Sequence, residues 1–137
     1  MTSKLITAGS DTDRQAIRDV LARLYKAWEA NDAEAFVADY TDDAIVIQPG
    51  VFKKDREEIR TTMAAGFTGP LKGSRATDTP VSVRFLTDDT ALVVSEGGIL
   101  FAGQDSVASE RTVRATWVLV RRDGGWLIAS YHNSPAS

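Results

Sequence analysis

The chain has 137 residues, of which 43% are hydrophobic and 26% charged, and its formal net charge is −3. These values are typical of one soluble globular domain with a proper core. Acidic and basic residues are interspersed, so the sequence lacks the basic excess that a nucleic-acid-binding protein needs to offset phosphate charge. It contains no cysteine, which excludes disulfides, thiolate catalysis and cysteine–zinc sites.

The first residues do not predict a targeting segment. Residues 1–10 contain one lysine and one apolar pair, Leu5-Ile6, which is too little for a signal peptide, and no apolar run approaches the length of a membrane span. We therefore expect a cytoplasmic protein with neither a nucleic-acid nor a membrane partner. We also expect a single domain over residues 1–137, with a loose tail at residues 1–9.

The first third of the chain predicts a long helix. Ser10–Asp13 offers capping oxygens, and Gln15 follows Thr12 at the spacing of a capping box. Apolar residues then recur at helical spacing, which predicts an amphipathic helix from Asp13 to about Ala30.

Two shorter helices are expected next. Asp32 is placed to cap the first of them. The apolar positions of that helix are Phe36, Val37 and Tyr40. Asp55 and Glu58 form a second capping box, which opens a helix that ends near Gly66.

The rest of the chain predicts strands. Apolar residues that are β-branched or alternate with polar ones are typical of strands, and they occur at 45–47, 81–85, 91–94, 112–120 and 126–131. Arg121–Gly125 is a hairpin signal, because glycine accepts the positive φ that such turns require. Helices followed by an antiparallel meander predict an α+β fold, with about three N-terminal helices covering one face of a curved antiparallel sheet.

Two of these strands, 91–94 and 117–120, are apolar on both faces. A half-exposed antiparallel sheet would alternate apolar and polar residues instead. One face can pack against the helices, and we expect the outer face to form a homodimer interface.

A family resemblance rests on Trp28–Asp32, on Tyr40–Ala44, and on Asp123–Trp126 followed by Tyr131–Asn133. With these segments the sequence resembles, over nearly its whole length, the SnoaL-like branch of the nuclear transport factor 2-like superfamily. Within that branch it is similar to the SgcJ/EcaC group, which is associated with enediyne antibiotic biosynthesis. The resemblance implies a cone-shaped, usually dimeric fold that encloses a pocket. It implies no single reaction, because this scaffold hosts isomerases, cyclases, dehydratases and inert binders.

Ketosteroid isomerases share this fold and use a carboxylate base with a tyrosine and a protonated aspartic acid as donors. The resemblance aligns the base with Gln48, the tyrosine with Leu24 and the second acid with a position near Thr116. None of these residues can take over its role, so the isomerase mechanism is not expected. The Gln48 amide can still orient a ligand oxygen.

His132 is the only histidine and ends the last predicted strand. Counting by two places it on one face with Ser130 and Ile128, and the resemblance implies that this face lines the pocket. A neutral imidazole there can shuttle a proton, which makes His132 a catalytic candidate. The alternative is a structural histidine that bonds a backbone group at the end of the sheet.

Glu96 interrupts an apolar strand, on the face of Leu92 and Val94, and precedes Gly97-Gly98. If that face is the interior, the carboxylate needs a partner such as Arg114 and becomes a second catalytic candidate. The alternative places Glu96 at a bulge that faces water.

Large side chains of the helical layer form a candidate pocket wall for a planar or polyene ligand, although they also suit an ordinary core. Trp28 and Tyr40 are favoured, because each lies near the end of its predicted helix. The predicted ligand-binding residues are Tyr25, Trp28, Tyr40, Gln48, Met63, Arg114, Thr116 and Ser130.

Three functional hypotheses follow. The first is a tailoring enzyme that acts on a polyketide-type or enediyne-type intermediate by acid–base chemistry, with His132 and Glu96 as its catalytic residues. The second is a non-catalytic protein that sequesters a reactive hydrophobic metabolite, and the third is a scaffold dimer with a vestigial pocket. The sequence contains neither a dinucleotide fingerprint nor a recognisable metal cluster, so we expect no cofactor and no metal. The expected partner is a hydrophobic small molecule.

Overall fold

The computed structural model describes residues 10–136. The helices are α2 (Asp11–Glu29), α3 (Ala33–Phe36), α4 (Arg56–Phe67) and the 3₁₀ turn η1 (Ser109–Arg111). The strands are β1 (Tyr40–Gln48), β2 (Val51–Lys53), β3 (Arg75–Thr87), β4 (Thr90–Leu100), β5 (Val113–Arg122) and β6 (Gly125–Pro135). The tail expected at residues 1–9 lies outside the described residues.

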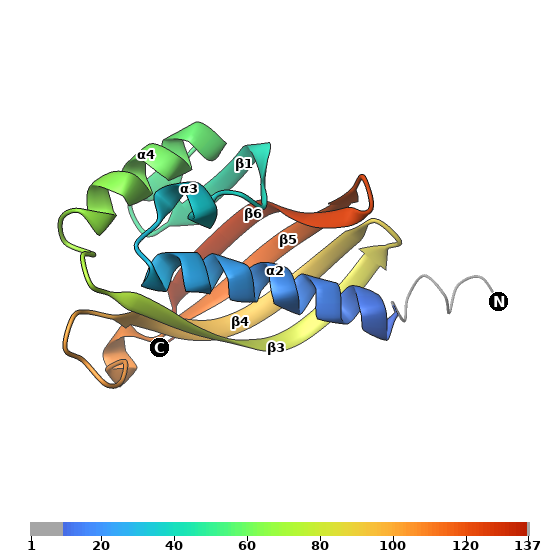
Figure 1. Ribbon diagram of the computed structural model, residues 1–137. Coiled ribbons are helices and arrows are strands. Elements are labelled where there is room, and N and C mark those ends of the chain that lie inside the picture. The colour runs from blue at the N-terminus through green and yellow to red at the C-terminus, as the bar shows by residue number, and fades with distance from the viewer. Residues whose placement is uncertain (1–9, 137) are drawn as a thin grey trace.

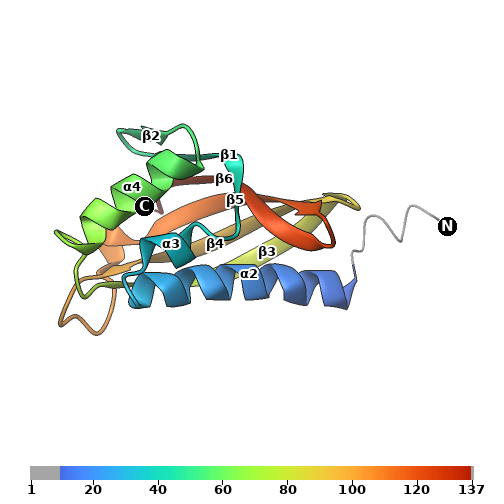
Figure 2. The ribbon, with the colours of Figure 1, turned by 45° about the horizontal axis from the view of Figure 1, so that its top comes forward.

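A six-stranded sheet in the order β2-β1-β6-β5-β4-β3 organises the fold. α2 lies across one face of this curved sheet, and α3 and α4 lie on the same side (Figure 1, Figure 2). The expected α+β architecture, with its helices on one face, is therefore confirmed. No helix within residues 10–136 is long and apolar enough to cross a membrane.

β1 departs from the expected antiparallel pattern. β3 to β6 form the antiparallel meander, but β1 pairs with β6 in parallel, with Ile45 opposite Ser130 and Ile47 opposite His132. The chain reaches this edge of the sheet from the end of α3 rather than through a hairpin. The tight connection that forces antiparallel pairing is therefore absent.

Side-chain caps mark the helix starts. The hydroxyl of Ser10 accepts the N–H of Asp13 at 2.9 Å, so Ser10 caps α2, and the expected box from Thr12 to Gln15 is not used. Gln15 instead donates to the carboxylate of Asp19 at 2.9 Å, one turn further along the helix.

The two later caps are confirmed. Asp32 accepts the N–H of Ala35 at 3.1 Å and starts α3. Asp55 accepts the N–H of Glu58 at 2.8 Å, and Glu58 reaches back to accept the N–H of Lys54 at 2.9 Å. Such reciprocal bonds satisfy donors that have no partner inside the helix.

Three segments differ from the expectation. α3 ends at Phe36, and Tyr40 begins β1 rather than continuing a helix. Strand β2 was not expected, and β3 begins at Arg75 rather than at Val81. Residues 75–80 are mostly polar, so they lack the apolar alternation by which strands are recognised. This unexpected part of β3 carries Asp78.

The hairpin between β5 and β6 is confirmed. Arg122 pairs with Gly125, which leaves a two-residue loop. Its residues Asp123 and Gly124 have φ of 54° and 81°. Two consecutive positive φ values define the type I′ turn, whose twist matches that of the flanking strands.

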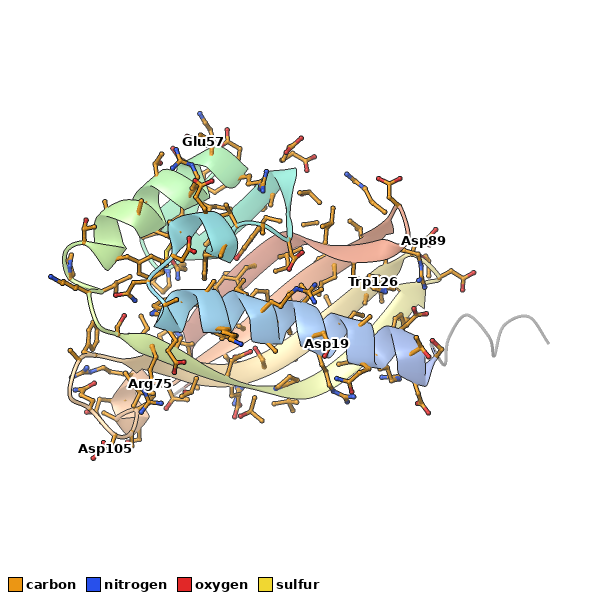
Figure 3. All side chains as sticks on the ribbon, viewed as in Figure 1. Asp19, Glu57, Arg75, Asp89, Asp105 and Trp126 are labelled. Atoms are coloured by element: carbon orange, nitrogen blue, oxygen red, sulfur yellow. The ribbon has the colours of Figure 1, made fainter. Side chains whose placement is uncertain are left out.

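Arg121 fastens the start of α2 to the sheet. Its guanidinium binds both carboxylate oxygens of Asp13, at 3.0 and 2.8 Å, and lies 3.3 Å from the carboxylate of Asp89. It also lies 4.7 Å from the ring centroid of Trp126. Figure 3 labels Asp89 and Trp126 at this end of the sheet. The helix is therefore held here by a bidentate ion pair rather than by apolar contact alone.

Candidate functional site

A cavity of about 480 Å³ lies between the sheet and the helices α2 and α4. This volume is typical of small-molecule sites. Pro70 and Arg111 belong to its lining and are exposed, so the α4–β3 and β4–β5 connections border the mouth. Both connections lie at the left end of the molecule in Figure 1. We call the sheet face that carries the cavity the inner face and its opposite the outer face.

Half of the residues predicted for the site line this cavity. α2 contributes two of them, β1 two and α4 one. They are Tyr25, Trp28, Tyr40, Gln48 and Met63.

The other half lie on the outer face, which corrects the predicted orientation of three strands. None of them belongs to the cavity lining. They are His132, Glu96, Arg114, Thr116 and Ser130.

An irregularity in β6 explains the position of His132. Leu119 of β5 pairs with Ile128 and Val118 pairs with Ser130, so Ala129 is an extra residue without a partner on β5. Such a bulge shifts the alternation of a strand by one residue. Ile128 therefore points inward, whereas Ser130 and His132 point outward.

Glu96 and Arg114 face each other across β4 and β5, and the Arg114 Nε donates to the Glu96 carboxylate at 2.8 Å. The anticipated ion pair is thus present, but the two side chains are 40% and 56% exposed. Val93 and Ser95 have no exposed surface and take the inner positions of β4. Glu96, next to Ser95, consequently points away from the cavity.

Asp78 is the acidic residue of the cavity, and sequence reasoning missed it. It is half-buried on the inner face of β3, opposite Gly97 of β4. The Gly97-Gly98 pair is the signal that could have found it, since glycines inside a strand indicate close backbone approach. A Cβ on Gly97 would lie 1.9 Å from the Thr77 carbonyl oxygen and 2.8 Å from the Asp78 Cα.

Burial raises the pKa of the Asp78 carboxyl to about 6. The hydroxyl groups of Ser95 and Tyr25 interact with this carboxyl and oppose the shift. Oδ2 has no hydrogen-bond partner within residues 10–136. No ion pair to Asp78 occurs in the described part of the chain either, so desolvation is not offset by a positive neighbour.

Two tyrosines lie close enough to sense the charge of Asp78. The pKa of Tyr25 is raised well above its ordinary value, first by burial and then by Asp78. Burial is also the main cause of the raised pKa of Tyr131, and Asp78 adds to it. The Tyr131 oxygen accepts a hydrogen bond from the Asn133 amide at 2.8 Å, which leaves the phenolic hydrogen free to donate.

Trp117 holds these groups in place. Its indole N–H donates to the buried hydroxyl of Ser95 at 3.0 Å. Its ring centroid lies 4.3 Å from that of Tyr131 and 6.2 Å from that of Tyr25, the latter edge-on. Trp117, Tyr25 and Tyr131 therefore form one aromatic wall of the cavity, which also contains Asp78.

A second hydrogen-bond network lies beside the cavity at the end of α2. The indole N–H of Trp28 donates to Ser74 at 2.9 Å, and Ser74 donates to the Leu71 carbonyl at 2.6 Å. The Asn31 amide donates to the Trp28 carbonyl at 2.7 Å and accepts the Gly73 N–H at the same distance. These bonds tie α2 to the connection that borders the mouth.

The family model described as a SnoaL-like domain matches residues 17–137. The chain belongs to the SnoaL-like family. A search of curated proteins finds no match.

Solved structures support the fold of this SnoaL-like domain. It is similar to a domain of unknown function with a cystatin-like fold from Nostoc punctiforme, at 26% identity and a TM-score of 0.85, covering 93% of this chain and 80% of that one. A nuclear transport factor 2-like protein of unknown function from Shewanella oneidensis is 20% identical, with a TM-score of 0.76 over 88% of this chain and 98% of that one. A ketosteroid isomerase-like protein from Erwinia carotovora atroseptica is 19% identical, with a TM-score of 0.73 over 93% and 99%.

The positions aligned with the isomerase residues carry no acid in this SnoaL-like domain. Leu24 and Gln48 line the cavity, whereas Thr116 faces outward. Asp78 reaches the cavity from β3, a strand on which none of those three positions lies. No group of three potential metal-ligating side chains occurs within residues 10–136.

Proposed function

We propose that this SnoaL-like domain binds a hydrophobic carbonyl compound and moves a proton on it by cofactor-independent acid–base chemistry at Asp78. The observation that carries the proposal is a half-buried carboxyl in a mostly apolar cavity, with a pKa raised to about 6 and no ion pair to it within residues 10–136. A general base works best when its pKa lies near the operating pH.

The surrounding groups suit removal of a proton next to a carbonyl. Above about pH 6 the Asp78 carboxylate accepts a proton from the acidic carbon, and negative charge develops on the carbonyl oxygen. The hydroxyl of Tyr131 stays protonated, because burial raises its pKa, and it donates to that oxygen. Return of the proton from Asp78 to another carbon of the same system completes an isomerisation without an added reactant.

The test measures hydrogen exchange on a small planar ketone. 2-Tetralone in deuterium oxide loses its α-proton signals in NMR spectra as the enolate forms. We expect the protein to accelerate this loss above the buffer rate, and Asp78→Asn to remove about 10²-fold or more of the acceleration. The control is His132→Ala, which alters an exposed side chain of the outer face.

The pH profile adds a second readout. The accelerated rate should rise through about pH 6 and level off above it, because the ionised form of Asp78 is the active one. A wild-type rate equal to the buffer rate, or an Asp78→Asn rate equal to that of the wild type, contradicts the proposal.

The second candidate function is sequestration of a reactive hydrophobic metabolite without turnover. The aromatic wall supports it, since Tyr25, Trp117 and Tyr131 offer stacking surfaces irrespective of any proton transfer. Tight binding of a planar ketone together with a buffer-level exchange rate would favour this candidate.

The finer assignments are proposals as well. Membership of the SgcJ/EcaC group would make the ligand a polyketide-type or enediyne-type intermediate of secondary metabolism. A homodimer through the outer face is supported by the partly exposed apolar residues Leu92, Val94 and Val118 on neighbouring strands. Light scattering at micromolar concentration should give a dimer that Val118→Glu dissociates, and a wild-type monomer would contradict this assembly.

A further inference from the structure

Lys53 is a buried cation in the wall of the cavity. It ends β2, where Val46 of β1 is its partner, and its inner-face side chain is only 9% exposed. The next residue, Lys54, is exposed. Within residues 10–136, the side chain of Lys53 makes no hydrogen bond and no ion pair. An ammonium group that lines a cavity without a protein partner can bind an acceptor group of a ligand.

Glu58 lies near Lys53 but forms no ion pair with it within residues 10–136. Burial lowers the pKa of the ammonium group, and the nearby carboxylate of Glu58 opposes that shift. The Glu58 carboxylate is itself used as part of the helix cap, where it accepts the N–H of Lys54. The hydrogen-bonding positions of the Lys53 ammonium therefore remain available to a ligand.

The charge of the cavity differs in sign from that of the whole chain. The formal net charge of the protein is −3, but within the described part of the chain the charged residues of the lining are two cations, Lys53 and Arg111, and one acid, Asp78. Arg111 lies at the mouth, with its guanidinium 5.6 Å from the ring centroid of Phe101. The cavity thus carries an excess of positive charge in an acidic protein, which favours an anionic ligand.

Lys53 and Asp78 approach the cavity from opposite edges of the sheet, because β2 and β3 are its two edge strands. Gln48, which also lines the cavity, lies two residues beyond the β1 partner of Lys53 and adds an uncharged donor on that side. From these observations we infer that the ligand is an organic acid, whose carboxylate binds Lys53 beneath α4 and whose apolar body extends toward Trp117 and Tyr131. This inference rests on the proposed function only in that it takes the cavity to be a small-molecule site.

The test compares two ligands of equal shape and different charge, 2-naphthoate and 2-naphthamide, by isothermal titration calorimetry. The wild type should bind 2-naphthoate about tenfold or more tightly than 2-naphthamide, since a hydrogen bond to a charged partner is stronger than one to a neutral group. Lys53→Met should reduce the affinity for 2-naphthoate to that for 2-naphthamide. The matched control, Lys54→Met, removes the same charge from the exposed neighbouring position and should preserve the preference.

Equal binding of the two ligands by the wild type would overturn the inference. A loss of affinity in Lys53→Met that is equal for both ligands would also overturn it, because it would indicate a structural role. If Lys53→Met fails to fold, Lys53→Gln keeps a donor without the charge and must lose the preference in the same way.

The outcome is separable from that of the proposed function. Preference for 2-naphthoate is a property of binding and needs no proton transfer. A wild type that prefers 2-naphthoate but does not accelerate exchange on 2-tetralone supports the acid-binding site and removes the proton-transfer proposal. If the wild type accelerates exchange but binds the two naphthyl ligands equally, the proton-transfer proposal is supported and the acid-binding site is removed.

Discussion

The two faces of the sheet place similar side chains in opposite electrostatic environments. On the inner face, Asp78 is half-buried and has no counter-ion among residues 10–136, and burial raises the pKa of its carboxyl to about 6. On the outer face, Glu96 is partly exposed and paired with Arg114. Their strands are adjacent, since Asp78 pairs with the residue that follows Glu96. The comparison shows that solvent and partner, rather than the residue type, decide whether a strand carboxylate is suited to proton transfer.

The largest loss of stability is expected at Gly97, where the close approach of β3 and β4 leaves no room for a side chain. Gly97→Ala places a Cβ against the Thr77 carbonyl oxygen and the Asp78 Cα, so β3 and β4 must move apart. We expect a loss of about 3 kcal/mol in the free energy of unfolding, measured by urea denaturation. Gly125→Ala is the control, because its nearest atom, the Arg122 carbonyl oxygen, lies 4.0 Å away. Equal losses for both variants would contradict the close approach at Asp78.

Asp78→Asn tests the electrostatic side of the comparison. The pKa of this carboxyl is about 6 in the folded state against 3.8 for its ordinary value, so ionisation weakens the native state. Well below pH 3.8 the carboxyl is protonated in both states, and the variant should match the wild type. As the pH rises from about 4 to 6, the unfolded state ionises before the native state does. The variant should therefore gain up to about 2 to 3 kcal/mol over this range, at about 1.36 kcal/mol per pKa unit, and the gain should level off above pH 6. Urea denaturation at several pH values measures this gain, and a gain that is constant with pH would contradict it.

Ser95→Ala tests an uncharged hydrogen bond of the inner face, from the Trp117 indole N–H to the Ser95 hydroxyl. The variant leaves the indole N–H of Trp117 buried without its acceptor. A buried donor without a partner costs about 1 to 3 kcal/mol, so the free energy of unfolding should fall by about that much. Near-ultraviolet circular dichroism should also change, since Trp117 packs against two tyrosines. An unchanged stability would mean that another group accepts from Trp117.

The outer-face pair should give the smallest effect. Glu96→Gln and Arg114→Met each break a cross-strand ion pair whose side chains are 40% and 56% exposed. Exposed pairs contribute about 0 to 1 kcal/mol and are screened by salt. We expect losses within that range by urea denaturation and no change in exchange on 2-tetralone. If Glu96→Gln loses the exchange activity, the catalytic carboxylate is Glu96 of the outer face rather than Asp78.

The sequence predicted the starts of α3 and α4 and the last hairpin correctly, because each depends on residues that are close together in the chain. The carboxylates of Asp32 and Asp55 cap the helices that their spacing predicted. The Asp123-Gly124 turn joins the last two strands as expected, because positive φ favours this pair of residues. The order of helices and strands was enough to predict helices on one face of a curved sheet. Tyr25 and Trp28 were proposed as pocket residues because they are large side chains of the helical layer, and both line the cavity.

The sequence did not predict which residues of each strand face the cavity. The inner residue Val93 and the outer residue Val94 are both apolar, so alternation could not show which face is inside. The extra residue Ala129 then reversed the orientation predicted for His132, and nothing in its own neighbourhood of the sequence indicates a bulge. Asp78 lies in a polar segment that does not resemble a strand, and it becomes one only by pairing with β4.

What the sequence determined by itself was therefore the starts of α3 and α4, the last hairpin and the order of helices before the meander. Capping, helical spacing and turn conformation are interactions between near neighbours in the chain. Only the tertiary structure decided which residues meet in the cavity. The raised pKa of Asp78 and the lowered pKa of Lys53 depend on how α2 and α4 exclude water from two opposite strands. Desolvation is set by atoms distant in sequence, and no pattern within a single strand records it.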